Sequence, residues 1–266
     1  TSHGPATVIA MCNQKGGVGK TTSTINLGAS LAEYGRRVLL VDLDPQGALS
    51  AGLGVPHYEL ENTVYNLLVE PRVSIDQVLI TTRVPGLDLV PSNIDLSAAE
   101  IQLVNEVGRE QSLARALYPV LDRYDYVLID CPPSLNLLTL NAMAAADAVL
   151  VPLQCEFFAL EGLSQLMRTI DMVKHSLNPS LEIQGLVLTM FDRRSALSGQ
   201  VANDVRAHFG DKVYESVIPR NVRVAEAPSF GKPALIYDLK CAGSQAYLRL
   251  AKEVVKRERQ RLKLAA

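Results

Sequence analysis

The sequence predicts an α/β protein with a doubly wound, mostly parallel sheet of about seven strands and helices on both faces. Short apolar runs alternate with segments of helical periodicity along the whole chain. Hydrophobic residues make up 48% of the chain, aromatic residues only 5%, and there is no Trp, as in parallel sheets covered by helices. No internal repeat, low-complexity segment or long linker divides the 266 residues, so we expect a single domain.

Seven apolar runs that end in turn or polar residues are the predicted strands. In chain order they cover 7–12, 36–44, 86–92, 124–133, 147–154, 183–192 and 212–219. Apolar residues at helical spacing predict helices between them, over 21–34, 97–107, 113–123, 135–146 and 160–177. A last helix is expected from Ser244 to about Leu264. Residues 1–5 match no pattern, and we expect them to lie outside the folded domain.

Charge and hydropathy restrict the classes of function. The net charge is −2, but the segment from Lys252 to Lys263 holds six basic and two acidic residues, so the chain ends in a basic helix. No apolar run reaches about 18 residues, and no charged and apolar leader opens the chain, so we expect a soluble, cytoplasmic protein without a membrane partner.

Four cysteines are scattered without metal-ligand spacing and are expected to be buried free thiols. They are Cys12, Cys131, Cys155 and Cys241.

A glycine-rich loop separates the first predicted strand from the first helix. Its glycines permit backbone conformations in which successive N–H groups point inward and cradle phosphate oxygens. The first turn of the helix adds free N–H groups and the positive end of its dipole. Lys20 would reach the terminal phosphates, and the Thr21 hydroxyl would hold Mg²⁺. The predicted nucleotide contacts from this loop are Lys15, Gly16, Gly17, Val18, Gly19, Lys20, Thr21 and Thr22.

The loop departs from the standard phosphate-binding pattern, because Gln14 stands where that pattern has Gly and Lys15 follows it. With Lys15, the loop resembles the deviant Walker A motif of the ParA and MinD class of ATPases. The resemblance implies that Lys15 reaches across a nucleotide-sandwich dimer to the partner's ATP. A cation there stabilises the charge of phosphoryl transfer only when two subunits meet, so hydrolysis would depend on assembly. The alternative is a solvated surface lysine.

The run "RRVLLVDLDPQG" ends in two carboxylates two residues apart. Alternation along an extended strand would put Asp42 and Asp44 on the same side, near the loop at the carboxyl end of the sheet. The family resemblance assigns Asp44 to the switch I position, which orients or activates the attacking water, and places Asp42 closer to the metal. Alternatively, the two acids cap a turn.

The run "YDYVLIDCPPS" places four apolar residues before Asp130. By resemblance, Asp130 is the Walker B acid that holds Mg²⁺ through a water, and 131–134 form switch II. The prolines of this loop stiffen a segment that must sense the terminal phosphate.

Similarity to chromosomal ParA, also called Soj, extends over nearly the whole chain. It includes segments outside the nucleotide loop, such as "VPLQCEFFALEGLSQL", "LVLTMFDRRSALSGQV", "VIPRNVRVAEAPSFGKPALIYD" and "GSQAYLRLAKEVV". The resemblance implies that Pro219 and Asn221 contact the adenine. The alternative is an ordinary strand-to-helix turn, with the base held by backbone atoms.

Basic residues in late turns and on the last helix could supply sequence-independent contacts to DNA phosphates. No module for reading the major groove is evident, and in the ParA family such residues bind the nucleoid as the ATP dimer. Singly, each cation could instead be a solvated surface charge. The predicted DNA contacts are Arg193, Arg194, Arg220, Arg223, Lys232, Lys240, Lys252 and Lys256, followed on the same helix by Arg257, Arg259, Arg261 and Lys263.

Together, these features predict an ATP- and Mg²⁺-dependent ATPase that forms a homodimer, binds double-stranded DNA non-specifically and partitions chromosomes or plasmids at the nucleoid. The family resemblance implies a ParB-type partner that stimulates weak intrinsic hydrolysis. One alternative is a positioning ATPase like MinD with a membrane-binding tail, although the tail has no Phe or Trp to bury. Another is a nucleotide-gated binding module with negligible hydrolysis, which Asp44 argues against.

Overall fold

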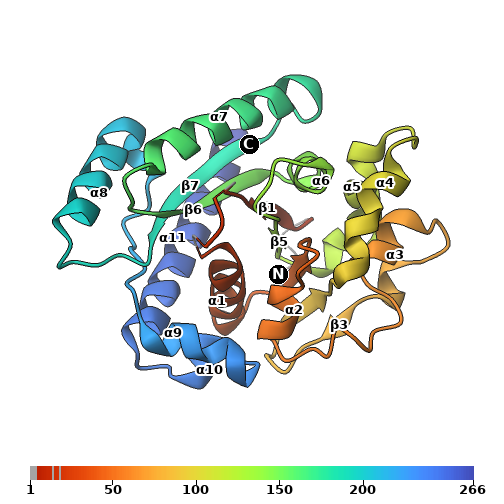
Figure 1. Cartoon of the computed structure of the whole chain (residues 1–266), viewed down its shortest axis with the longest axis horizontal. Coiled ribbons are helices and arrows are strands. Elements are labelled where there is room, and N and C mark those ends of the chain that lie inside the picture. The colour runs from red at the N-terminus through yellow and green to blue at the C-terminus, as the bar shows by residue number, and fades with distance from the viewer. Residues whose placement is uncertain (1–4, 14, 18) are drawn as a thin grey trace.

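A computed structural model describes residues 5–13, 15–17 and 19–266. At its centre lies one seven-stranded sheet in the order β3-β4-β2-β5-β1-β6-β7 (Figure 1). Every neighbouring pair is parallel except β3 with β4. The strands are β1 (Thr7–Met11), β2 (Val38–Asp42), β3 (Ile80–Thr81), β4 (Leu87–Val90), β5 (Tyr126–Asp130), β6 (Ala148–Gln154) and β7 (Glu182–Thr189).

Helices cover both faces of this sheet, which confirms the predicted doubly wound class. They are α1 (Lys20–Glu33), α2 (Ala48–Gly52), α3 (Val64–Val69), α4 (Ala99–Leu103), α5 (Ser112–Leu117), α6 (Leu137–Ala145), α7 (Ala159–Ser176), α8 (Ala196–Phe209), α9 (Val222–Glu226), α10 (Ala234–Tyr237) and α11 (Ala242–Ala265). Within the described part of the chain, none of the helices is long and apolar enough to cross a membrane.

Alternate side chains of the strands point into two separate hydrophobic cores, one on each face of the sheet. On one face, Val8 and Ala10 of β1 pack with apolar residues of helices α3 to α8. On the other face, Ile9 and Met11 of the same strand pack with apolar residues of α1, α2, α10 and α11. In Figure 1, α7 lies above the sheet and α1, α9 and α10 lie below it. The period of two along β1 therefore divides its side chains between the two layers of helices.

The central strands end level with one another. Met11 of β1 and Asp42 of β2 are both register partners of Asp130 on β5. Since all three strands are parallel, the loops that follow them meet at the carboxyl edge of the sheet, where α/β folds bind ligands.

The prediction of a strand over 212–219 was wrong. This segment makes only isolated bridges, of Val213 with Leu186 and of Pro219 with Phe191. Its N–H groups are divided between β7 and α11, because the backbone N–H groups of Glu215 and Ser216 donate to the carboxylate of Glu253. The seventh strand is instead the short antiparallel edge strand β3.

Two predicted helices are shorter than expected. The segment 97–107 contains only α4 after a 3-10 turn, and Gly108, at φ 68°, marks the turn that follows it. The segment 113–123 contains α5, which becomes a 3-10 helix at Tyr118–Arg123, where Pro119 lacks an N–H donor. At the start of the chain, the prediction for residues 1–5 lies mostly outside the described residues.

Candidate nucleotide site

The glycine-rich loop lies between β1 and α1 at the carboxyl edge of the sheet. Gly17 and Gly19 have φ angles of 71° and 82°, a left-handed region that disfavours residues with a side chain. Gly19 is the N-cap of α1, so the loop leads directly into free helical N–H groups. An open cavity of about 310 Å³ lies at this point. It is lined by Gly16, Gly17, Gly19, Lys20, Thr21, Thr22, Asp44, Pro133 and Met190.

Thr21 and Asp130 are brought together beside this cavity. The Thr21 hydroxyl donates to Oδ2 of Asp130 over 2.7 Å. Oδ1 of Asp130 is buried and has no hydrogen-bond partner among the described residues. A buried carboxylate oxygen left unpaired beside a hydroxyl fits a hard cation such as Mg²⁺.

Burial dominates the electrostatics of Asp130. Its side chain is fully buried, and burial, followed by the nearby charge of Asp42, raises the pKa of Asp130 to about 8. Without a cation, the buried carboxyl therefore holds its proton more tightly than a solvent-exposed aspartate does. A divalent cation would displace this proton and remove the cost of a buried negative charge.

Asp42 is also fully buried, but its oxygens are occupied. The N–H and hydroxyl groups of Ser50 donate to its Oδ2 over 3.0 and 2.7 Å, and the N–H of Asp44 donates to its Oδ1 over 3.2 Å. Burial raises the pKa of Asp42 to about 6, against the effect of these hydrogen bonds. Asp42 therefore holds the turn after β2 in place, and its predicted position nearer the metal stays a prediction.

Asp44 lies beyond the end of β2, so a turn rather than strand alternation positions it. Its carbonyl accepts from the N–H of Gly47 over 2.9 Å, and its Oδ1 accepts from the N–H of Gln46 over 3.0 Å. The half-buried side chain nevertheless lines the cavity. Asp44 therefore caps the turn, as the alternative interpretation expected, and its carboxylate also lies where it could orient a water molecule.

The two lysines of the loop differ in environment. Lys20 is buried, with 7% of its surface exposed, and its Nζ donates to the carbonyl of Lys15 over 3.5 Å. The Lys15 side chain is 44% exposed and forms an ion pair with Glu156, which follows β6. The ammonium group of Lys15 therefore contacts a carboxylate of its own chain in the unpaired subunit.

Several residues at this edge were not identified from the sequence. Asn13 holds the loop, because its Oδ1 accepts from the N–H of Lys15 over 3.0 Å and its Nδ2 donates to the carbonyl of Pro152 over 2.8 Å. Met190 lines the cavity with a φ of 47°, which is unusual for a residue with a side chain. No local pattern marks Glu156 or Met190, because each becomes relevant only through its contact with the distant loop.

The predicted adenine contacts do not line this cavity. Asn221 is the N-cap of α9, with its Oδ1 accepting from the N–H of Val224 over 3.2 Å, and Pro219 bridges to Phe191. Their role toward a base stays a prediction, as do those of all the residues named for this site. Val18 lies outside the described residues.

The predicted DNA contacts fall in two regions. Arg193, Arg194 and Arg220 gather beyond the carboxyl end of β7, where the N–H of Arg220 donates to the carbonyl of Phe191 over 3.2 Å. Arg223, on α9, forms ion pairs with Glu226 and Asp238. The other four, all exposed, lie on the α9–α11 side of the molecule or along α11 and are Lys232, Lys240, Lys252 and Lys256.

The cysteines include one close pair. The Sγ atoms of Cys12 and Cys131 lie 3.4 Å apart at the ends of β1 and β5. This hydrogen bond, together with burial, raises the pKa of the Cys131 thiol. The prediction of free thiols is confirmed, with three of the four buried.

The doubly wound fold and this edge define a P-loop nucleotide-binding protein, with a lysine and a threonine at the start of α1 and an acid ending the neighbouring strand. Residues 6–183 match the AAA_31 family model, described as an AAA domain. The chain belongs to the ParA/Soj family of chromosome-partitioning ATPases.

Three relatives illustrate this membership. The chromosome partitioning protein ParA of Caulobacter vibrioides is 62% identical over 100% of both chains. The sporulation initiation inhibitor protein Soj of Bacillus subtilis is 54% identical over 93% of this chain and 97% of that protein. A crystal structure from Mycobacterium smegmatis, described as cobyrinic acid a,c-diamide synthase with bound ATP analog and magnesium, is 40% identical over 96% of each chain, with a TM-score of 0.84.

Proposed function

We propose that this chain is an ATPase that dimerises on ATP, binds DNA without sequence preference and drives the partitioning of chromosomes or plasmids. The observation that carries the proposal is the single cavity that collects Lys20, Thr21 and Asp44 beside Asp130. Membership of the ParA/Soj family supports ATP hydrolysis. The M. smegmatis relative, with its bound ATP analog and magnesium, supports ATP and Mg²⁺ as the cofactors.

The chemistry of the site follows from charge and position. The loop N–H groups and the ammonium of Lys20 would bind the phosphates, while Thr21 and Asp130 would hold Mg²⁺, which neutralises negative charge on the phosphates. Asp44 would orient the attacking water, a task that needs alignment more than a strong base. We assign a low rate to the chain alone, because Lys15 is paired with Glu156 rather than free to act.

Lys15 is proposed to act on the ATP of a second subunit. Lys15→Ala should keep ATP binding, which rests on Lys20 and the loop backbone, but should lose ATP-dependent dimerisation or stimulated turnover. Equilibrium binding of a fluorescent ATP analogue and turnover with a ParB-type partner measure the two effects. Lys174→Ala, on α7, is the matched control. Unchanged stimulated turnover in Lys15→Ala would remove the cross-subunit role.

DNA binding is the second part of the proposal. Retention on a random duplex should require ATP and should fall at least about tenfold between 50 and 200 mM salt, because several phosphate contacts release counterions. Arg220→Glu with Arg223→Glu should reduce this retention while leaving ATP affinity unchanged. Arg72→Glu with Arg168→Glu, two exposed arginines elsewhere, is the matched control. Equal retention with ADP, ATP and no nucleotide would contradict gating by the dimer.

One other function has a test of its own. Vesicle co-sedimentation that disappears when α11 is truncated would favour a membrane-positioning ATPase like MinD. We do not extend the synthase activity named for the M. smegmatis protein to this chain, because the identity to Caulobacter ParA is higher, at 62% against 40%.

A further inference from the structure

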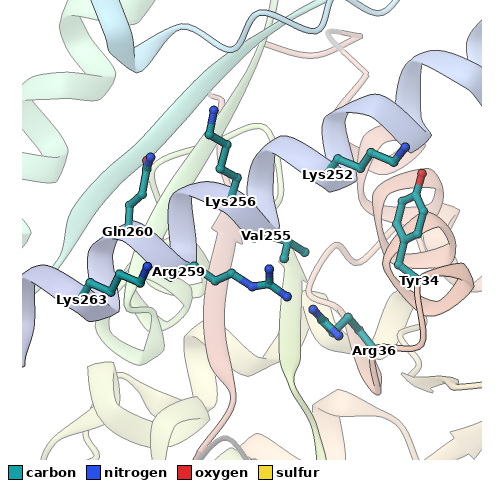
Figure 2. Close-up of a pocket in the computed structure, with 8 residues that line it drawn as sticks. All are labelled: Tyr34, Arg36, Lys252, Val255, Lys256, Arg259, Gln260 and Lys263. Carbon is teal, nitrogen blue, oxygen red and sulfur yellow. The ribbon is translucent and has the colours of Figure 1, made fainter.

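A groove lies between the end of α1 and the last turns of α11 (Figure 2). It encloses about 470 Å³. Cationic side chains line most of it, with Val255 as its aliphatic contact. The lining residues are Tyr34, Arg36, Lys252, Val255, Lys256, Arg259, Gln260 and Lys263.

The positive charge of the groove exceeds the negative charge beside it. None of its five cations forms an ion pair with any described residue of the chain. Two acids, Asp125 and Glu258, line the adjoining hollow, and their ion pairs are with Arg37 and Arg261 outside the groove. In Figure 2, the side chains of Arg36 and Arg259 point toward one another. Two like charges facing each other repel, and an anion placed between them would relieve the repulsion.

The arrangement along α11 fits a regular polyanion. Lys252, Lys256, Arg259 and Lys263 recur at steps of four, three and four residues, so they share one face of the helix over about 16 Å. The Nζ of Lys252 lies 5.5 Å from the centre of the Tyr34 ring, which helps to hold it in place. The lining offers no apolar pocket for the buried anchors on which protein interfaces depend. A nucleic-acid backbone therefore fits better than an acidic peptide.

The groove lies at the edge of the sheet opposite the nucleotide loop. Tyr34 follows α1, about 21 Å along that helix from Lys20. An adjoining hollow reaches Thr7 and Tyr126, the first residues of β1 and β5. Arg193, Arg194 and Arg220 lie beyond the other end of the strands, and β7 alone spans about 23 Å. At physiological salt this separation exceeds the Debye length of about 8 Å, so the two cationic regions act independently.

We infer that this groove is a second docking surface for the backbone of duplex DNA, so that the protein can hold two duplex segments together. The inference rests on the proposed function, because the first segment is the one bound near Arg220 and Arg223. A duplex is stiff over about 150 base pairs, so a short segment held at one edge does not bend round to the other. Segments bound at opposite edges are therefore separate pieces of DNA or distant parts of one molecule.

A two-duplex capture experiment tests the inference. Wild-type protein with ATP and Mg²⁺ is bound to a short duplex on beads, and a second, fluorescent duplex is added. Wild type should capture the second duplex. The double variant Lys256→Glu with Arg259→Glu should reduce capture of the second duplex at least about tenfold. Its retention on the bead-bound duplex should fall no more than about twofold, because the cations at the carboxyl edge of the sheet remain. Arg72→Glu with Arg168→Glu should behave as wild type.

Each other outcome has a definite meaning. Unchanged capture in the groove variant, or wild-type retention without any capture, would overturn the second docking surface and leave the proposed function standing. Equal losses of retention and capture would indicate one continuous DNA surface and also overturn it. A groove variant that loses binding to polyglutamate but keeps capture would assign the groove to an acidic protein. Failure of wild type to retain even the first duplex would overturn the proposed function as well.

Discussion

Lys15 makes different contacts in the single chain and in the proposed dimer. In the single chain its ammonium group pairs with Glu156, 141 residues away in the sequence. Both side chains are about two-fifths exposed, so the pair contributes at most about 1 kcal/mol. Such a contact is weak enough to be exchanged for another partner, and it holds the Lys15 ammonium on a residue that does not line the cavity.

Glu156→Gln tests this exchange. Removal of the carboxylate charge should free Lys15 and raise ATP-dependent dimerisation and partner-free turnover by up to about fivefold, the equivalent of the exposed ion pair. Turnover measured over a range of protein concentrations separates dimerisation from the chemical rate. Glu161→Gln, at an exposed acid on α7 that forms no ion pair with any described residue, should leave both unchanged. If turnover plotted against protein concentration is the same for Glu156→Gln and for wild type, the ion pair does not restrain Lys15.

At the scale of elements, α11 organises the segment that precedes it. Glu253 accepts from the N–H groups of Glu215 and Ser216 over 3.0 and 2.6 Å and from the Ser216 hydroxyl. The guanidinium of Arg257 donates to the carbonyls of Lys212 and Val213 over 3.1 Å each. The last helix therefore supplies hydrogen-bond partners to a segment that makes only isolated bridges to the sheet.

Glu253→Ala should destabilise the fold by about 1–3 kcal/mol, because it leaves two backbone N–H groups without their charged acceptor. Glu253→Gln should recover part of this loss, since the amide oxygen still accepts. The free energy of unfolding in urea measures the effect. Arg249→Ala, an exposed position on the same helix, serves as the control for a change in helix propensity. Equal stability of Glu253→Ala and wild type would mean that water replaces the carboxylate without cost.

At the scale of the whole molecule, the two buried acids at the carboxyl edge link stability to pH. The pKa values of Asp42 and Asp130 are raised from 3.8 to about 6 and about 8, with burial as the largest cause. The folded chain therefore holds protons more tightly than the unfolded chain. The contribution of these groups to folding free energy is favourable at low pH and is lost as the pH rises through 6 and 8.

Without Mg²⁺ and nucleotide, Asp130→Asn should therefore be more stable than wild type at pH 8, by on the order of 2–5 kcal/mol, while the difference should shrink toward pH 5. Asn can still accept from Thr21, so the comparison isolates the buried charge. Urea unfolding at pH 5, 6, 7 and 8 provides the measurement. A stability difference that stays constant across this range would mean that the Asp130 carboxyl does not titrate there. Saturating Mg²⁺ and ATP should reverse the order at pH 8.

The sequence by itself determined the fold class, the position of the glycine-rich loop between strand and helix, and the position of Asp130 at the end of a strand. Each of these depends on a short contiguous pattern of residues. An apolar run followed by glycines, Lys20 and Thr21 specifies strand, loop and helix from neighbouring residues alone. A local helical pattern was not enough at 97–107, where α4 ends at Leu103 ahead of the turn at Gly108, or at 113–123, where α5 becomes a 3-10 helix that contains Pro119.

Only the tertiary structure decided which distant residues meet. The pairing of Lys15 with Glu156, the use of Glu253 in place of a strand partner and the groove between α1 and α11 each join segments far apart in the chain. The sequence of a charged, exposed helix does not show whether a given side chain faces solvent, an acid or another cation. The packing of that helix against its neighbours decides which of these the side chain faces. The strength of an electrostatic interaction depends on distance and burial, not on the order of residues along the chain.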